Sequence, residues 1–301
     1  MLKIFLCEPI HPRALALLKT RAEVFSDPAC LGRADAAISR NLRMDAAFLE
    51  QCPALKVIGI HGTGTDRVDL AAAAQRGVRV VYAPGENAQS VAELIVGLTL
   101  ALARRVYLAD RMLQTGEALA IADARLTGME LHGKTLGLVG VGSIARRAAE
   151  MFRRAFGMSI VGYSPSLTEE RAACLGIARC TCVREVFAWA DVVSIGVPLT
   201  PQTRGLVGTA ELAAAKPGAL LVNTARGGVV DEDALYRALT QGPLGAAACD
   251  VLAHEPPAPG LPLLRVGMCV VEQIFTVLDG KTPAHECIGT TDRTDVESEH
   301  K

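Results

Sequence analysis

The segment from Thr135 to Ala145 constrains the fold of this chain more than any other. It reads Thr-Leu-Gly-Leu-Val-Gly-Val-Gly-Ser-Ile-Ala, an apolar strand that runs into a Gly-x-Gly-x-x-Ala turn. Gly140 permits a tight turn, Gly142 leaves room for a pyrophosphate against the backbone, and Ala145 lets the following helix pack close to the strand. The pattern therefore predicts a strand, a glycine turn and a helix that together bind a dinucleotide.

The helix that begins after this turn supplies the phosphate contacts. Free N–H groups of its first turn, at Ser143 and Ile144, face the pyrophosphate and attract its negative charge. A second apolar strand at Ser159–Tyr163 follows at the spacing where a ribose-reading residue belongs. The alternative is an ordinary strand-to-helix turn whose glycines serve packing alone. Agreement between the two strands and the helix favours dinucleotide binding.

Strand-like and helical segments alternate along the chain, which is typical of parallel sheets. The strand-like runs are Lys3–Cys7, Val57–Ile60, Val78–Val81, Leu136–Val139, Ser159–Tyr163, Val192–Val197 and Ala219–Asn223. We expect an α/β protein with a doubly wound Rossmann domain at residues 101–281. A smaller, flavodoxin-like α/β domain at residues 1–100, joined by the tail 282–301, should bind the substrate in a cleft between the two domains.

Composition and charge exclude several classes of protein. Half of the residues are apolar and the formal net charge is −1, so no basic face for nucleic acid is expected. The longest apolar run, Val91–Ala103, is interrupted by Glu93 and is shorter than the roughly 20 residues that span a bilayer. The start of the chain, Met1–Cys7, lacks the pattern of a signal peptide. We therefore expect a cytoplasmic protein without a membrane partner.

The cysteines do not form a metal-binding or disulfide pattern. There are nine, an odd number, scattered along the chain. Cys180 and Cys182 are separated by one residue and lack the second pair that a zinc site requires. The sequence favours free, buried thiols and predicts no metal site.

Three further motifs connect the chain to a known family. Residues 223–231 read Asn-Thr-Ala-Arg-Gly-Gly-Val-Val-Asp, residues 249–256 read Cys-Asp-Val-Leu-Ala-His-Glu-Pro, and residues 57–66 read Val-Ile-Gly-Ile-His-Gly-Thr-Gly-Thr-Asp. With the glycine turn, they resemble the D-isomer-specific 2-hydroxyacid dehydrogenases, which include phosphoglycerate dehydrogenase and glyoxylate or hydroxypyruvate reductase. The resemblance extends to about Leu264. It implies hydride transfer between a nicotinamide and a small D-2-hydroxy or 2-keto acid.

The resemblance assigns roles to four residues near the substrate. Arg226 matches the catalytic arginine, whose planar, permanently charged guanidinium suits a carboxylate and the adjacent oxygen. The backbone N–H groups of Thr63 and Gly64 match the place where the family binds the substrate carboxylate. Glu255 matches the glutamate that orients the catalytic histidine and raises its pKa.

The resemblance also assigns cofactor contacts beyond the glycine turn. They are Val197 and Pro198 beside the adenosine, Thr224 and Ala225 along the ribose and nicotinamide, and Asp250 on the carboxamide. Ser164 stands where NAD enzymes usually have Asp or Glu on the ribose hydroxyls. Serine removes the repulsion of a 2′-phosphate, but no arginine follows in residues 165–169. We predict NAD as cofactor, with NADP possible.

One expected segment departs from the family pattern. The catalytic histidine should follow in a strand and loop after residue 266, yet the run from Gly267 has the helical spacing of the family's last helix. The histidine segment is therefore expected to be missing and turnover to be impaired. His285, His254 and His61 are the alternatives considered, none of them with the family's spacing.

Two helical regions carry weaker predictions. Asn87 is expected to cap a helix with its side chain, by accepting a free N–H of the first turn. The stretch from Leu98 to Gly116 resembles the family's dimer arm and implies a homodimer. The functional alternatives are an NAD(P)-dependent oxidoreductase and a non-catalytic dinucleotide-binding relative that senses or binds a partner.

Overall fold

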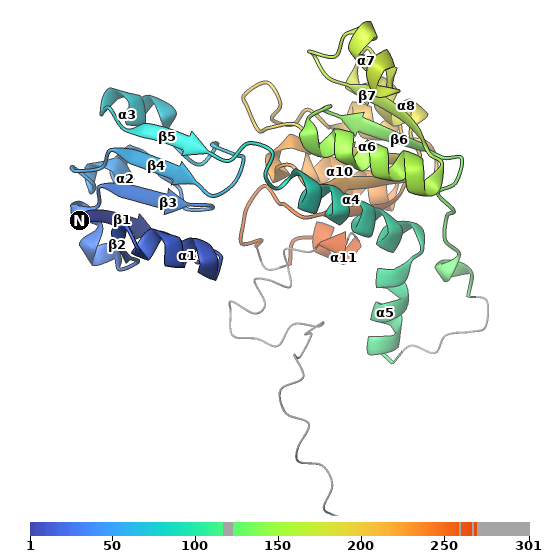
Figure 1. The fold of residues 1–301 in the computed structure, drawn as a ribbon. Coiled ribbons are helices and arrows are strands. Elements are labelled where there is room, and N and C mark those ends of the chain that lie inside the picture. The colour runs from blue at the N-terminus through green and yellow to red at the C-terminus, as the bar shows by residue number, and fades with distance from the viewer. Residues whose placement is uncertain (117–122, 259, 267, 270–301) are drawn as a thin grey trace, which may run out of the picture.

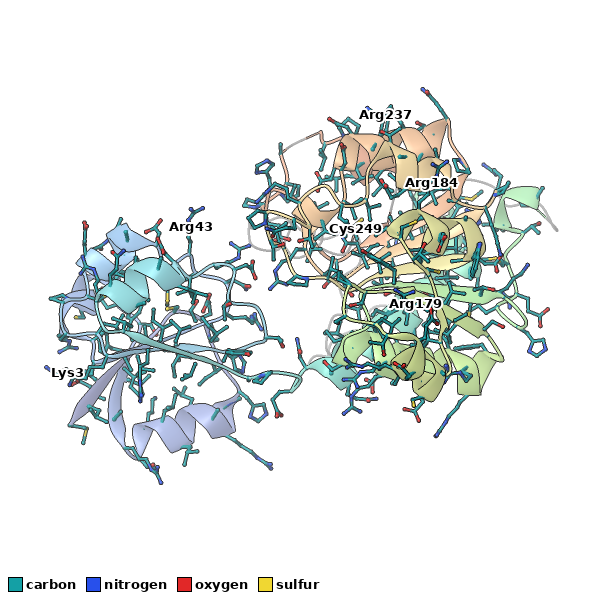
Figure 2. The ribbon with its side chains drawn as sticks, turned by 90° about the horizontal axis from the view of Figure 1, so that it is seen from above. Lys3, Arg43, Arg179, Arg184, Arg237 and Cys249 are labelled. Carbon is teal, nitrogen blue, oxygen red and sulfur yellow. The ribbon has the colours of Figure 1, made fainter. Side chains whose placement is uncertain are left out.

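The molecule consists of two lobes, each built on its own parallel sheet (Figure 1). The structure, a computed structural model, describes residues 1–116, 123–258, 260–266 and 268–269. Seen from above, Lys3 and Arg43 lie in one lobe, while Arg179, Arg237 and Cys249 lie in the other (Figure 2). No helix among these residues is both long and apolar enough to cross a membrane.

The first lobe contains a five-stranded sheet in the order β2-β1-β3-β4-β5, with every pairing parallel. Its strands are β1 (Leu2–Leu6), β2 (Ala22–Phe25), β3 (Ala36–Ser39), β4 (Val57–Ile60) and β5 (Arg79–Tyr82). Its helices are α1 (Pro12–Lys19), η1 (Pro28–Arg33), α2 (Ala46–Glu50) and α3 (Leu70–Gln75). This strand order is that of the flavodoxin-like sheet, as predicted.

The second lobe contains a seven-stranded parallel sheet in the order β12-β11-β10-β9-β6-β7-β8. Its strands are β6 (Thr135–Val139), β7 (Ser159–Tyr163), β8 (Ala178–Arg179), β9 (Val192–Ile195), β10 (Ala219–Asn223), β11 (Leu244–Cys249) and β12 (Met268–Cys269). The first six strands in chain order follow the Rossmann arrangement, with the reversal of strand order between β6 and β9. The predicted α/β fold class is confirmed.

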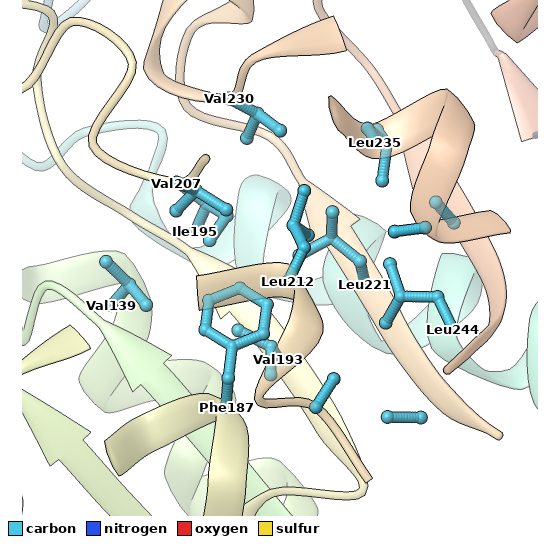
Figure 3. Close-up of a cluster of buried hydrophobic side chains, with 14 of the residues drawn as sticks. Val139, Phe187, Val193, Ile195, Val207, Leu212, Leu221, Val230, Leu235 and Leu244 are labelled. Atoms are coloured by element: carbon cyan, nitrogen blue, oxygen red, sulfur yellow. The ribbon is translucent and has the colours of Figure 1, made fainter. Parts of the chain in front are cut away.

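Helices accompany the second sheet on both faces (Figure 1). The helices of this part of the chain are α4 (Ala88–Ala103), α5 (Val106–Gln114), η2 (Ala124–Leu126), α6 (Ser143–Phe156), α7 (Glu169–Leu175), α8 (Val183–Trp189), α9 (Thr209–Ala213), η3 (Gly227–Val229), α10 (Glu232–Thr240) and α11 (Leu263–Val266), of which α5 projects away from the sheet. One core cluster includes Phe187, Ile195 and Leu221 (Figure 3). Another joins Ile95 and Leu98 of α4 to Phe152 of α6. Helix α4 crosses the predicted domain boundary and packs on the second sheet.

Several strands were not predicted, because their residues are not typical strand formers. Strand β11 reads Leu-Gly-Ala-Ala-Ala-Cys, and β3 reads Ala-Ala-Ile-Ser. Small residues are required where backbones approach closely: a Cβ at Gly245 would lie 2.7 Å from the carbonyl oxygen of Gly218. Burial within the sheet outweighs the weak intrinsic preference of alanine for strands. Strand β2 was also missed, and β8 was missed because it has only two residues.

The end of the described chain corrects one expectation. Met268 and Cys269, expected at the start of a helix, form strand β12, which pairs in parallel with Ala248 and Cys249 of β11. The expectation that no strand follows residue 266 is therefore wrong at these two positions. Pairing with the exposed edge of β11 decides their conformation, which helical spacing further along the chain cannot reveal. The helix expected beyond them lies outside the described residues.

Candidate functional site

The glycine turn after β6 has the conformation that a phosphate-binding turn requires. Gly140 has a φ of 95°, in the left-handed region that favours glycine. A Cβ there would lie 2.6 Å from the carbonyl oxygen of Gly196 and 2.8 Å from Cγ1 of Val197. The turn is thus held tightly against the end of β9, at the point where the strand order reverses and ligands of such sheets bind.

The N-terminus of α6 has free space beside it, unlike the tightly packed turn at Gly140 that precedes it. Gly142 is the N-cap, its side-chain position has no heavy atom within 4 Å, and no side chain caps the helix. Ser143 is exposed and Ile144 partly buried at this end, while Ala145 is buried against the sheet. Uncapped N–H groups at the start of a 14-residue helix, with open space before them, fit a pyrophosphate.

The other predicted cofactor contacts follow the carboxyl ends of strands in the same sheet. Ser164 follows β7, and its hydroxyl lies 3.2 Å from that of Ser166. Val197 and Pro198 follow β9, and Asp250 follows β11. Since parallel strands end at one edge, the structure places these residues along the edge that carries the glycine turn. This arrangement fits an extended dinucleotide such as NAD, although each contact stays a prediction.

The loop after β4, residues 61–67, meets the second lobe at Arg226. A Cβ at Gly64 would overlap the Arg226 guanidinium and lie 2.7 Å from Oδ1 of Asp66. A side chain at position 64 would therefore have to displace the ends of Arg226 and Asp66. Thr63, exposed in the same loop, donates its hydroxyl hydrogen to Oδ1 of Asn87 at 2.9 Å. The residues predicted to bind the substrate carboxylate thus come together although they lie far apart in the chain.

Arg226 is fixed by a carboxylate that sequence reasoning did not assign to the site. Its Nε and Nη2 donate to Asp66 at 3.0 and 2.8 Å, and its Nη1 donates to the carbonyl oxygen of Ala225 at 2.7 Å. Burial raises the pKa of Asp66, but the hydrogen bonds and charge of Arg226 outweigh this, so the pKa lies below its ordinary value. The pair is only partly exposed, at 38% for Arg226 and 26% for Asp66.

Glu255 is held in a similar way in the loop after β11. Its Oε1 accepts the Leu252 N–H at 3.0 Å, and its Oε2 lies 3.3 Å from Nη2 of Arg67. Burial, followed by the negative charge of Glu255, raises the pKa of Asp250 above its ordinary value. Glu255 and Asp250 therefore lie close enough to interact electrostatically.

The loops that carry Arg226 and Glu255 are themselves in contact. A Cβ at Gly227 would overlap the backbone of Leu252, so this position also requires glycine. Asn223, fully buried at the end of β10, accepts the Ala225 N–H and donates to the carbonyl oxygen of Arg226. Thr224, predicted to contact the cofactor, lies in the same loop after β10. The role of Asn223 was missed, although an asparagine ending an apolar strand is the signal that could have revealed it.

Asn87 corrects a prediction. It is the N-cap residue of α4, but its side chain forms no capping hydrogen bond. The side-chain oxygen instead accepts the Thr63 hydroxyl, which links α4 to the loop after β4. The Thr63 hydroxyl, from another part of the chain, thus takes the place of the expected N–H group of α4.

The histidines considered as proton donors lie in different places. His254 lines a cavity with Asp231, Glu232 and Tyr236, which Glu255 does not line. His61 is exposed at the start of the loop after β4, and His285 lies outside the described residues. No histidine in the described ranges is hydrogen-bonded to Glu255.

Six cysteines, Cys7, Cys30, Cys52, Cys174, Cys180 and Cys182, are free thiols. Cys52, Cys180 and Cys249 are buried, whereas Cys174 and Cys182 are exposed, so the prediction of buried thiols holds only for some. Burial raises the pKa of Cys7 to about 12 and that of Cys180 to about 11. No group of metal-ligating side chains was found in the part of the chain that the structure describes.

Comparison with known proteins gives one consistent result. Residues 96–272 match the family described as D-isomer specific 2-hydroxyacid dehydrogenase, NAD binding domain. D-3-phosphoglycerate dehydrogenase of Methanocaldococcus jannaschii is 39% identical over 93% of this chain and 58% of its own length. Glyoxylate reductase of Aeropyrum pernix is 36% identical over 80% of this chain and 78% of its own.

A solved structure agrees over nearly the whole chain. The TT0316 protein from Thermus thermophilus superposes with a TM-score of 0.80 at 33% identity, covering 95% of this chain and 100% of that one. The chain spans about half the length of several curated D-3-phosphoglycerate dehydrogenases that it matches.

Proposed function

The chain belongs to the D-isomer specific 2-hydroxyacid dehydrogenases, and from this we propose that it transfers a hydride between a nicotinamide cofactor and a small D-2-hydroxy or 2-oxo acid. The observation that carries the proposal is the position of Arg226, whose guanidinium lies directly on Gly64 of the other lobe. A permanently charged anchor thereby faces the loop predicted to hold the substrate carboxylate, at the edge of the sheet where the cofactor is expected.

Arg226 binds the substrate and polarises its reacting bond. Its guanidinium has five N–H donors, and the bonds to Asp66 and Ala225 engage three of them. One N–H on Nη1 and one on Nη2 are left for a ligand, enough to hold a carboxylate oxygen and the neighbouring 2-oxo oxygen. The bound cofactor supplies or accepts the hydride. Arg226 stabilises negative charge that develops on the 2-oxo oxygen as the hydride arrives.

Proton transfer to that oxygen needs a titratable group, because Arg226 stays protonated. Glu255 is proposed as the carboxylate half of an acid–base pair, because it matches the family's glutamate and is held in the loop after β11 by the Leu252 N–H and Arg67. In the family its partner is a histidine, in a segment that the sequence predicts to be missing from this chain. Without an aligned partner, turnover would fall by about 10²- to 10⁴-fold while binding persists.

The test is reduction of glyoxylate, hydroxypyruvate and pyruvate, followed by the absorbance of NADH or NADPH. Arg226→Ala should reduce kcat/KM by on the order of 10³-fold, because it removes both anchor and charge stabilisation. Arg184→Ala, an exposed arginine on α8, is the matched control and should leave the rate unchanged. Equal rates for the wild type and Arg226→Ala would refute the assignment.

A second candidate is a non-catalytic protein that retains cofactor binding. It is favoured by the observation that Arg226 and Glu255 are both already paired with side chains of the first lobe. Calorimetry of NADH binding separates the two. Binding without turnover of any 2-oxo acid would support the second candidate, and binding with turnover that Arg226→Ala abolishes would exclude it.

Three finer assignments complete the proposal. Ser164 in place of an acidic residue should allow NADP as well as NAD, which competition calorimetry can measure. Helix α5 exposes Val106 and Leu113, which supports a homodimer through this helix. Light scattering of the wild type and Leu113→Glu tests it. A cytoplasmic location, and the exclusion of nucleic acid and membranes as partners, stay predictions.

A further inference from the structure

Two consecutive residues of the first lobe hold the two side chains to which the proposed function gives chemical roles. Asp66 pairs with Arg226 in the loop after β10, and Arg67 pairs with Glu255 in the loop after β11. The partners lie 160 and 188 residues apart in the chain. Both loops belong to the second lobe, so each pair joins the lobes.

We propose that Asp66 and Arg67 are positioning residues that align Arg226 and Glu255 only when the lobes are together. The inference rests on the proposed function, because it gives these residues a role in that same site. A substrate between the lobes would then meet an arginine and a glutamate that the first lobe has already oriented.

The contacts of Arg226 support an orienting role for Asp66. Asp66 accepts from the Nε and Nη2 side of the guanidinium, and Ala225 accepts from Nη1. A planar group held on two sides cannot rotate about its bonds, so its remaining N–H donors keep one direction. The guanidinium of Arg226 is thus fixed by Ala225 of its own loop and by Asp66 of the opposite lobe.

The backbone around Gly64 makes this orientation depend on the distance between the lobes. The guanidinium occupies the place where a side chain at Gly64 would lie. Moving the loop after β4 away would therefore remove both the packing surface and the Asp66 carboxylate. The loop itself is anchored, since Met44 N–H donates to Arg67 O at 2.8 Å and Asp69 N–H donates to Met44 O at 2.9 Å.

Glu255 shows the same division between a local and a distant contact. Its Oε1 is held within its own loop by Leu252, and its Oε2 faces Arg67 across the lobe boundary. Removing Arg67 leaves one contact, about which the carboxylate can turn. The side chain of Arg67 is 46% exposed, so its ion pair with Glu255 adds little to the stability of the fold. Its main effect is to orient the Glu255 carboxylate.

A different role for Asp66 makes the opposite prediction. If its carboxylate merely occupied the place of the substrate carboxylate, its removal would free Arg226 and strengthen anion binding. If it orients Arg226, its removal weakens anion binding, because the guanidinium loses its direction. The two roles differ in the sign of one measurable change.

The experiment measures binding of oxalate, a planar dicarboxylate, to the NADH-loaded protein by calorimetry. Asp66→Asn, which keeps the size of the side chain, should weaken oxalate binding about 10-fold or more and leave NADH affinity unchanged. Arg67→Gln should leave oxalate affinity nearly unchanged but lower kcat. The controls Glu23→Gln and Arg43→Gln remove ion pairs within the first lobe and should change neither.

Small-angle X-ray scattering without ligands gives a readout independent of catalysis. The variant Asp66→Asn/Arg67→Gln should have a larger radius of gyration than the wild type, whereas Glu23→Gln/Arg43→Gln should not. Unchanged or tighter oxalate binding by Asp66→Asn, or equal radii, overturns the inference. A wild type that binds no NADH overturns the proposed function instead. In that case the comparison of the radii of gyration by itself tests the positioning role.

Discussion

The two sheets of this protein share one architecture but use the point of strand reversal differently. In the second lobe the reversal lies between β6 and β9, and the N-terminus of α6 there carries no side-chain cap. In the first lobe the reversal lies between β1 and β3. There Glu8, just after β1, accepts the N–H groups of Arg40, Asn41 and Leu42 at 2.9, 2.7 and 2.8 Å.

The difference shows that a fold supplies anion-binding backbone but the side chains decide whether it is available. Three successive N–H groups pointing to one carboxylate form a concave anion site, and Glu8 fills it. At α6 the equivalent groups meet open space beyond Gly142. Among the described residues no side chain caps α6, so its first N–H groups are open to a ligand at the strand reversal, where the topological rule predicts binding.

Removing Glu8 should have the largest effect on stability. Glu8→Ala leaves three N–H groups without their acceptor and should destabilise the first lobe by about 3 kcal/mol, measured by urea unfolding. Phosphate should restore part of the loss by occupying the vacated site, whereas it should not alter the wild type. Equal stability of Glu8→Ala and wild type would mean that the comparison between the two sites is mistaken.

The glycine turn of the second lobe offers a matched pair. Gly140→Ala should cost about 2 kcal/mol of stability, because Gly140 has a φ of 95° and its Cβ would strike Gly196. Gly142→Ala should leave stability nearly unchanged, since its Cβ meets no neighbour, yet it should weaken NADH binding by crowding the phosphate. Thermal unfolding and calorimetry of both variants separate the two effects. A large loss of stability in Gly142→Ala would contradict an open site.

Acidification should weaken the contact between the lobes. The pKa of Asp66 is lowered in the folded protein, so its ion pair with Arg226 adds stability above the ordinary carboxyl pKa and loses it as pH falls through the folded-state pKa. The melting temperature of Asp66→Asn should therefore approach that of the wild type as the pH is lowered below about 4. A difference that stays constant between pH 3 and 7 would show that charge is not involved.

The cysteines should differ in how fast they are alkylated, and this difference should not involve the stability of the fold. Cys7 and Cys180 have pKa values raised to about 12 and 11, so their thiolates are scarce at neutral pH. Cys174 and Cys182 are exposed. Brief treatment with iodoacetamide and peptide mapping should find label at the exposed pair and little at Cys7 and Cys180. Rapid labelling of Cys7 would indicate that the first lobe opens readily.

Local patterns were sufficient to predict much of the molecule. The Gly140–Ala145 turn predicted the Rossmann unit because its glycines are required by backbone geometry within a few residues. Alternation of strands and helices predicted two parallel sheets. The motifs around Arg226 and Glu255 identified the loops that meet at the lobe boundary.

Other features depended on partners distant in the chain. Asp66 looked like part of a substrate loop, and only the approach of Arg226 gave it a role. Asn87 was predicted as a helix cap, but Thr63 takes its side-chain oxygen instead. Strand β12 forms because the edge of β11 is available for pairing. Such choices are made by competition between local and distant partners, which sequence spacing does not record.

The sequence by itself therefore determined the fold class, the glycine turn and the family, because these rest on conformations that a few neighbouring residues impose. The tertiary structure alone decided which anion site is occupied and which is open, and which carboxylate orients Arg226. Those outcomes depend on the distances between side chains that folding brings together. Two polar groups form a hydrogen bond only when these distances are about 3 Å.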